Sequence, residues 1–492
     1  MSLNWITFII AAVGLIIVGG LSGAKAKKAS SADDTGEGFL LGAKQIGAVV
    51  GAGTLMATGY SGWGFIGSPG TAYAYGTIEV LANFFFAPGI VFGTLFFASF
   101  MRKQSGKYGG MTVPEYLAVT HSGSHKLKRV VQFTAGLATF IFLSVYIIGQ
   151  IRAVGLVGAE WLGVSEVFAS TILMLIIVIF TMQGGLLAVA VTDAIMCAGM
   201  LIGATYITVV IAQNISFSEL FAAVGKVAPE FLNPTTSIPY GGGKHSVYLV
   251  FIYALLFTTT LPYMSVRFLS LTEDIKVHRM ALIMAPIGIV LSFIPLVGIY
   301  MYYENPNLAV ADSAMPVFLN NYLPPFATAL ITLFILFAML STISSVLQAL
   351  ASALSYDLFV SIADRNSKYG DLFNRLAVAV TAALGMILTY LAPQGMLNQI
   401  AYIGTGGLIA SFTGPTIMRV FVKADLKTCF VSMLVGFVSN VILVFIVGAG
   451  WVEAPIISAL LGSIVYLVMG YINNGMRRFP VEEEVKPNRE TV

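Results

Sequence analysis

Long apolar runs divide most of this sequence, and they restrict the chain to a narrow class of folds. Thirteen such runs follow one another, and each has about the 17–25 residues that a helix needs to cross a membrane. Inside a bilayer every backbone polar group needs an internal partner, so runs of this kind predict helices. The sequence therefore predicts an all-α, polytopic membrane protein with about 13 transmembrane helices. The expected spans are 5–22, 41–67, 77–101, 130–158, 166–183, 188–213, 248–270, 281–303, 326–356, 374–392, 398–420, 428–448 and 454–472.

The composition supports this class and excludes others. Hydrophobic residues make up 57% of the chain and charged residues 10%, against roughly 25% charged residues in an average soluble domain. The net charge of +3 gives no support for nucleic-acid binding. Cys197 and Cys429 both fall inside apolar runs, where they behave as small hydrophobic residues and imply no disulfide framework. The four histidines all lie in expected loops without a metal-ligand cluster, so we expect no enzyme.

The charges of the loops predict how the spans are oriented. With an N-terminus outside the cell, alternate loops on the cytoplasmic side hold nearly all basic residues, and the outer loops keep only Lys226 and Lys244. The first run has no basic residue before it, which favours a retained span over a cleavable signal, although residues 22–24 could form a cleavage site. We therefore expect a cell-membrane protein with an outer N-terminus and a cytoplasmic C-terminus.

Two spans carry interruptions. The second span has six glycines from Gly51 to Gly67, and the seventh has three threonines, 258–260, followed by Pro262. Unwound backbone at membrane depth is tolerated only where it is buried in protein or lines a cavity. The interruptions lie five spans apart, and an odd offset places them in oppositely oriented halves. Although glycine and proline are common in membrane helices, interruptions at matching places of inverted halves predict a transporter with its binding sites near mid-membrane.

The ninth span, 326–356, carries a polar face. In a helix, Ala338, Ser341, Thr342 and Ser345 stand at i, i+3, i+4 and i+7, so they share one side. Small and hydroxyl residues also let neighbouring helices approach, with each hydroxyl bonded to its own turn. Beside a glycine-broken span, this face predicts one wall of a cation site.

Motifs in four of the spans occur in an order typical of one transporter family. They are Ser61-Gly62-Trp63 with Phe65 to Gly70, Ala72-Tyr73 and Tyr75-Gly76; Gly184-Gly185 leading to Ala188 and Thr192-Asp193; Leu261-Pro262 with Arg267; and Ala338 to Thr342 followed by Asp357-Leu358. With these motifs the chain resembles the sodium/solute symporter family over nearly its full length, and it is most similar to the pantothenate permease branch. The resemblance implies a leucine-transporter-type core of two inverted five-helix repeats, in which the first helix of each repeat is broken.

The resemblance also implies a sodium site between the second and ninth spans. Its ligands would be the hydroxyls of Ser341 and Thr342 together with backbone carbonyl groups at the break and on the ninth span. Several neutral oxygens suit a hard, singly charged cation, so we expect Na+ as the coupling ion. The implied ligands of this site are Ala57, Tyr60, Ala338, Ser341 and Thr342.

Some members of the family hold a second sodium ion against an aspartate of the sixth span. Asp193, Ser344 and Ser345 stand at the corresponding positions here, and Ser341 is a candidate ligand of both sites. An ionisable residue inside a span is costly and indicates function, although this aspartate could instead pair with a donor near the inner surface. Several relatives carry an acidic residue where Gly59 stands, so a role for that carboxylate does not transfer to this chain.

Arg152 lies well inside a span, two positions after Gln150, which matches a glutamine of the family. A guanidinium at this depth predicts an anionic partner such as a substrate carboxylate, although it could instead extend to the outer surface or pair with Glu160. Two sodium ions with one carboxylate would leave a net charge for the membrane potential to drive inward. The other expected substrate-binding residues are Ser61, Gly62, Trp63, Thr259, Tyr263 and Gly406.

Together these patterns predict a secondary active transporter that carries a small organic solute into the cell with sodium by alternating access. The solute is expected to be a carboxylate of the pantothenate, monocarboxylate or sialic acid type, and a sodium/proline or sodium/sugar symporter is the alternative. A proton-coupled symporter is disfavoured because a proton needs a titratable group. A solute sensor of the same fold is disfavoured because only about twenty residues follow the last span, too few for an output domain.

The expected partners are sodium ions, the solute and the lipid bilayer. The expected segments are 1–37 (first span and loop), 38–213 and 248–421 (the two repeats), 214–247 (outer loop), 422–472 (two peripheral spans) and 473–492 (cytoplasmic tail).

Overall fold

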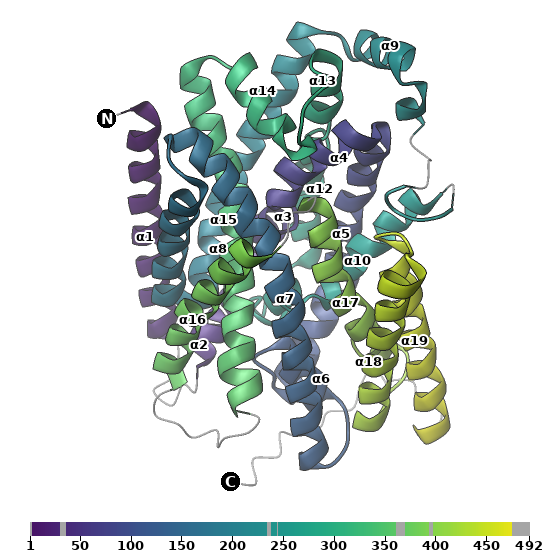
Figure 1. Ribbon diagram of the computed structural model, residues 1–492. Helices are drawn as coiled ribbons and strands as arrows, with labels where there is room; N and C mark the ends of the chain where they lie inside the picture. Colours follow the sequence, from purple (N-terminus) through teal and green to yellow (C-terminus); the bar gives the residue numbers. More distant parts are fainter. Residues whose placement is uncertain are drawn as a thin grey trace.

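Helices occupy the apolar runs and lie mostly along one axis of the molecule (Figure 1). The computed structural model describes residues 2–29, 36–233, 238–243, 245–360, 370–392 and 397–474. The described residues form no β-strand, and this confirms the predicted all-α class.

The helices of the first half of the chain alternate between long spans and short connecting helices. Long helices cross the bundle, and the shorter ones lie at its two ends or at breaks (Figure 1). Their bounds are α1 Leu3–Ala29, α2 Glu37–Leu40, η1 Gly42–Lys44, α3 Ala48–Gly59, η2 Trp63–Gly67, α4 Ser68–Tyr75, α5 Thr77–Tyr108, α6 Val113–Thr120, α7 His125–Leu162, α8 Glu166–Asn214, α9 Phe217–Val227 and η3 Pro229–Leu232.

The second half repeats this alternation. Its central helix, α15, carries the polar face that the sequence predicted. The bounds are η4 Ser246–Tyr248, α10 Leu249–Thr260, α11 Pro262–Leu269, α12 Val277–Leu291, α13 Leu296–Glu304, η5 Ala311–Ser313, α14 Ala314–Tyr322, α15 Pro325–Ser352, η6 Ala353–Val360, α16 Gly370–Leu391, α17 Leu397–Ile417, η7 Met418–Val420, α18 Leu426–Val441, η8 Ile442–Val447 and α19 Glu453–Asn474.

Side-chain caps fix where several long helices begin. The hydroxyl of Ser124 accepts from the third backbone N–H of α7, and Ser165 does the same for α8. The carboxylate of Asp425 caps α18 in this way. Because the first N–H groups of a helix have no partner inside it, such caps set its starting residue.

The second span is broken where the sequence predicted. α3 ends at Gly59, and Tyr60 leaves the helical region with φ −94° and ψ 50°. The chain resumes as a π-helical turn at Trp63 and continues into α4. The seventh span is broken as well, because Leu261 is extended and Pro262 starts a new helix, α11. The axes on either side of this second break differ by 58°.

A third discontinuity falls inside α8. Gly185 has φ 54° and ψ −145°, which a side chain would strain, and it divides α8 into two helical stretches. Among the described residues, nine helices are long and apolar enough to cross a membrane, and the bent pair at Leu261 makes a tenth. Thirteen spans are reached only if Gly185 divides α8 into two spans, α3 with α4 forms one span and α17 forms another. The number of spans therefore stays a prediction.

α15 lies at the centre of the bundle. Nearly all of its residues from Ile331 to Ser352 are buried, and it packs against α3, α7, α8 and α11. Helices at the edge instead present large apolar side chains outward, such as Ile10 of α1, Ile446 of η8 and Leu460 of α19. Exposed apolar surface of this kind suits a lipid environment. The broken helices are thus placed beside the most enclosed helix of the fold.

The two ends of the bundle differ in their contents. One end carries α4, α9, α13 and α14, and the other carries α2 and α6 (Figure 1). We refer to them as the α9 end and the α2 end.

Candidate functional site

A polar junction forms where the broken end of α3 meets the middle of α15. The Ser341 hydroxyl lies 3.2 Å from the carbonyl oxygen of Ala57 and 3.0 Å from that of Ala338. The Thr342 hydroxyl lies 3.1 Å from the carbonyl oxygen of Thr58. All five residues are fully excluded from solvent. Hydroxyls of one helix therefore converge with carbonyl groups of another at a dry site.

The local sequence explains why these oxygens are available. Because α3 ends at Gly59, its last carbonyl groups have no partner within the helix. Tyr60 lies in the break, but the contacts that Ser341 and Thr342 make with described residues do not include its carbonyl group. The Tyr60 side chain instead points to Ser292, with 2.9 Å between the two hydroxyl oxygens. The structure thus brings together four of the five expected ligands and places the fifth beside them in the break.

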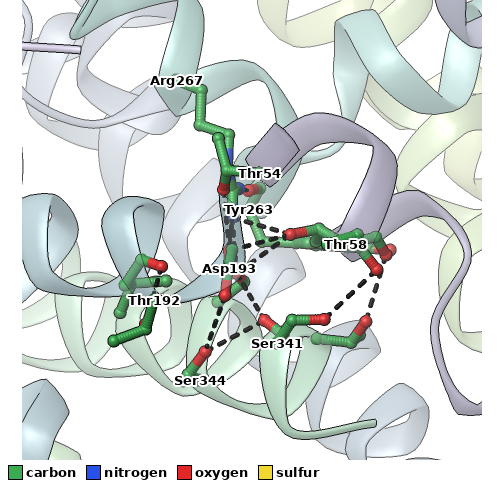
Figure 2. Close-up of polar contacts among 12 residues, drawn as sticks. Thr54, Thr58, Thr192, Asp193, Tyr263, Arg267, Ser341 and Ser344 are labelled. Atoms are coloured by element: carbon green, nitrogen blue, oxygen red, sulfur yellow. Dashed lines mark hydrogen bonds and ion pairs between the residues drawn. The ribbon is translucent and has the colours of Figure 1, made fainter. Parts of the chain in front are cut away.

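A buried carboxylate of α8 lies beside α3 and α15, about one turn from the junction. Asp193 of α8 accepts hydrogen bonds at Oδ2 from Thr54 (2.7 Å), Thr58 (3.2 Å) and Ser345 (3.2 Å). The Ser344 hydroxyl lies 3.5 Å from Oδ1 (Figure 2). Neutral donors from α3 and α15 therefore surround this carboxylate.

The charge of Asp193 is balanced by Arg267 of α11. The guanidinium Nη2 lies 3.0 Å from Oδ2, and both side chains are fully buried (Figure 2). Arg267 also donates from Nε to Thr54 at 2.7 Å and from Nη2 to Thr58 at 2.9 Å. Two buried charges are tolerated at such a place only when they are paired and their remaining donors are satisfied.

This ion pair bears on the expected second sodium site, which stays a prediction. Asp193, Ser344 and Ser345 lie together, and in the conformation described the carboxylate of Asp193 is paired with Arg267. Ser341 donates to carbonyl groups rather than to the carboxylate. Sequence reasoning treated Arg267 only as part of a motif. The sequence signal for this ion pair was that an aspartate and an arginine, two residues of opposite charge, each lie inside an apolar run.

Aromatic side chains fill the space beside the first break. A cavity of about 10 Å³ remains between Trp63, Tyr146, Tyr253 and Tyr402, which is room for about one water molecule. The Tyr146 ring stacks on that of Tyr263, with 5.6 Å between the ring centroids. The bundle is therefore closed around this space in the conformation described.

Three expected substrate-binding residues hold the break in place. The backbone N–H of Gly62 donates to Gln150 Oε1 at 3.1 Å. The Ser61 hydroxyl lies 3.2 Å from that of Tyr146. These contacts connect the break in the second span to α7, which forms another wall of the cavity.

Arg152, the expected carboxylate clamp, bonds to the end of a neighbouring helix, and its role toward a substrate stays a prediction. Its guanidinium donates to the carbonyl oxygens of Thr389 (2.9 Å) and Ala392 (3.0 Å), at the C-terminal end of α16. The last carbonyl groups of a helix lack partners and carry partial negative charge, so a cation is stabilised there. Arg152 thus connects two helices and does not line the aromatic cavity.

Two further expected residues, Thr259 and Gly406, do not line the aromatic cavity. A side chain at Gly406 would meet Pro455 at 2.6 Å, so this glycine permits the close packing of α17 against α19. The Thr259 hydroxyl donates to the carbonyl oxygens of Leu255 and Leu256 in its own helix. Residue types alone did not reveal which side of each helix points inward.

The α9 end of the cavity holds carboxylates that the sequence reasoning did not single out. Glu79 is fully buried and accepts hydrogen bonds from Ser68 (2.5 Å), Asn83 (2.9 Å) and Tyr240. Asp312 accepts from the backbone N–H of Leu397 at 3.1 Å, and burial raises the pKa of Asp312 to about 6. Glu79 stands near the start of an apolar run, where an acidic residue is also expected simply as a favourable helix start.

Two broken helices around a central polar helix define a leucine-transporter-type core, and solved structures with this fold superpose on the chain. A substrate-bound, outward-open Na+-coupled sialic acid symporter matches with a TM-score of 0.76 at 19% identity, over 96% of this chain and 97% of that one. MhsT in complex with L-phenylalanine matches with a TM-score of 0.52 at 14% identity, over 86% and 98%. At such identities the likeness concerns the fold, and it confirms the predicted core.

The chain belongs to the sodium:solute symporter family, which matches residues 39–436. The sodium/pantothenate symporter of Escherichia coli (strain K12) is 25% identical over 467 residues, covering 93% of this chain and 94% of that protein. The high-affinity proline transporter of Bacillus subtilis (strain 168) is 26% identical over 417 residues, covering 81% and 84%. These findings confirm the resemblance seen in the motifs and make the chain a multi-pass, sodium-coupled symporter.

Proposed function

We propose that this protein moves a small organic carboxylate into the cell together with Na+, which binds at the junction of α3 and α15. The observation that carries the proposal is the Ser341 hydroxyl, which contacts Ala57 and Ala338 across the helix break. Unwound backbone carbonyl groups and hydroxyls are the donors that hold sodium in transporters with broken helices. Thr342 and the neighbouring Tyr60 carbonyl complete the proposed ligand set.

We propose one sodium ion per solute, on the basis of the charges at the site. In the conformation described, Asp193 is already paired with Arg267, so a second sodium ion there would meet a buried guanidinium at close range. The neutral junction at Ser341 lacks such a competing charge among the contacts described. We therefore propose that Na+ occupies the neutral junction and that a second ion can reach Asp193 only if Arg267 withdraws.

A carboxylate solute is supported by the geometry of the break and by the relatives. The helical segment from Trp63 through α4 begins at the cavity, and the N-terminus of a half-helix attracts anionic groups. Pantothenate, proline and sialic acid, the solutes named for similar proteins, all carry a carboxylate. The aromatic lining with Trp63 and Tyr402 adds apolar surface for the rest of the molecule.

The distribution of charge supports an orientation with the α2 end in the cytoplasm. Basic residues gather at the ends of α1, α5 and α7 that lie there, and Lys226 is the one described lysine or arginine on the connection at α9. Alternating access would then open the aromatic cavity first toward the α9 end and afterwards toward the α2 end.

Uptake by proteoliposomes tests the proposal. Pantothenate, a monocarboxylate, sialic acid, proline and a sugar are offered with and without an inward sodium gradient. We expect accumulation of one of the carboxylates only when the gradient is present. Accumulation that is equal with sodium and with choline, while a proton gradient drives it, would replace this proposal by proton coupling.

A further inference from the structure

A second buried cavity lies on the α2 side of the sodium junction. It has a volume of about 20 Å³, enough for one or two water molecules, and it lies between α6, α7, α11 and α15. Neither lysine nor arginine is among its described lining residues. Its polar lining consists of Thr112, Thr139, Ser345, Gln348, Ser352 and Asp357.

Gln348 presents an unused acceptor at this cavity. Its Nε2 donates to the carbonyl oxygen of Phe39 in α2 at 3.2 Å, and the side chain is only 3% exposed. Its Oε1 has no hydrogen-bond partner among the described residues. A buried acceptor without a partner costs roughly 1–3 kcal/mol, so a purely structural role leaves this oxygen unexplained.

Asp357 places a carboxylate at the same cavity. It lies in η6, directly after α15, and is 1% exposed. Thr112 donates to its Oδ1 at 2.6 Å and Gln132 at 3.2 Å, so the bonds from described residues both end on one oxygen. The lone pairs of Oδ2 remain for another ligand, and the nearby donors hold the carboxylate in position.

Ser345 connects the cavity to the sodium junction along one face of α15. Ser345 lines it and also donates to the carbonyl oxygen of Ser341 at 2.8 Å. From Ser345 the polar residues Gln348 and Ser352 follow at i+3 and i+7, so they face the same side. A row of oxygen atoms therefore leads from Ser341 through the cavity to Asp357. Because Arg267 Nη2 donates to the Ser345 hydroxyl, an ion can pass Ser345 only when Arg267 withdraws.

We propose that this row is the exit route of the transported cation, with Gln348 Oε1 and the Asp357 carboxylate as successive transient ligands on its way to the cytoplasm. The proposal rests on the proposed function and on the α2 end facing the cytoplasm. A hard monovalent cation is the matching ligand, because Gln348 Oε1 and the carboxyl group of Asp357 offer it oxygen ligands. Phe39 and Leu40 of α2 close the route in the conformation described.

Inhibition by sodium from the cytoplasmic side tests the route. Sodium inside proteoliposomes opposes release of the transported ion, so its half-inhibitory concentration reports the affinity of the exit sites. We expect Asp357→Asn and Gln348→Met each to raise this concentration at least threefold, because the ion loses a ligand. The external sodium concentration for half-maximal uptake should change less than twofold, since both residues lie beyond the junction.

Glu115→Gln provides the matched control. Glu115 is also buried, accepts from Tyr356 at 2.9 Å and from the backbone of Met111 at 2.8 Å, and does not line the cavity. Its removal deletes a neighbouring charge without removing a ligand, so the internal sodium inhibition should match that of the parent. If Asp357→Asn fails to fold, Gln348→Met decides the question alone.

Sodium-driven uptake with unchanged internal inhibition in the folded variants would overturn the exit route and leave the proposed function intact. A parent protein whose uptake ignores sodium on both sides would instead overturn the proposed function. If Glu115→Gln raised the half-inhibitory internal sodium concentration as much as Asp357→Asn does, the cause would be a general loss of negative potential. That result would also contradict transient ligation of the ion by Asp357.

Discussion

The guanidinium of Arg267 lies 3.0 Å from the carboxylate of Asp193, and neither side chain has any exposed surface. This pair connects α11, the second half of one broken helix, to α8. Thr54 and Thr58 of α3 bond to both charged groups, so the pair also holds the other broken helix. Movement of either broken helix must therefore break or carry along a fully buried ion pair.

Removing one partner of this pair should destabilise the protein strongly. Asp193→Asn and Arg267→Gln each leave one buried charge uncompensated, and we expect each to cost about 3 kcal/mol of stability. The double variant should lose less than the sum of the two. Thermal unfolding of the four purified proteins in detergent measures this cycle, and strictly additive losses would argue against direct pairing.

The sodium stoichiometry should appear as a dependence on membrane potential. One Na+ with one monocarboxylate carries no net charge, so a 100 mV potential should leave steady-state accumulation of a monocarboxylate nearly unchanged. With zwitterionic proline the same potential would act on one net charge, worth about 2.3 kcal/mol, which is roughly 40-fold in accumulation. Measuring accumulation at imposed potassium diffusion potentials distinguishes the cases. A 40-fold response with a monocarboxylate would restore the second sodium ion.

The two glycines on either side of Trp63 should tolerate alanine very differently. A side chain at Gly62 would lie 2.9 Å from Gln150 Oε1 and 3.0 Å from Met339 Cγ, whereas one at Gly64 would meet its nearest neighbour at 3.5 Å. We expect Gly62→Ala to lower initial uptake roughly tenfold through displacement of the break, while Gly64→Ala stays near the parent. Initial uptake rates normalised to membrane protein amount measure this, and equal rates in both variants would remove the Gly62 contact from the mechanism.

Arg152→Ala should reduce stability without changing the selectivity for anions. The guanidinium caps the C-terminal carbonyl groups of α16, and charge-assisted hydrogen bonds of this kind contribute about 1.5–3 kcal/mol. We expect a lower melting temperature and an unchanged ratio of KM values for an anionic and a neutral solute. A selective rise of KM for the anion would support the carboxylate clamp that the sequence predicted at Arg152.

The sequence was most informative where a backbone feature is encoded locally. Dense glycine and a proline after three threonines indicated both helix breaks, and helical spacing placed Ser341 and Thr342 on one face. The partner of that face could be named because the motifs matched a family. Loop charges indicated the two ends of the bundle because basic residues are sorted by membrane insertion rather than by packing.

The sequence was least informative where the rotation of a helix decides the outcome. Arg152, Thr259 and Gly406 have residue types that suit a binding site, yet Arg152 bonds to the end of α16, Thr259 bonds within its own helix and Gly406 packs against α19. Pairing between different helices was equally hidden, since Asp193 and Arg267 lie on consecutive spans, 74 residues apart in the sequence. Single-sequence patterns describe one helix at a time, whereas these contacts depend on how helices pack together.

The sodium dependence of uptake tests whether Na+ binds between α3 and α15. In the Ser341→Ala/Thr342→Ala variant two proposed ligands of Na+ are lost, so the external sodium concentration for half-maximal uptake should rise at least fivefold. Thr381→Ala is the matched control, because it removes a buried hydroxyl that bonds to its own helix α16 at 2.8 Å. The account predicts parent-like sodium dependence for the control and a large shift for the double variant. An unchanged half-maximal sodium concentration in a folded double variant would contradict a sodium site between α3 and α15.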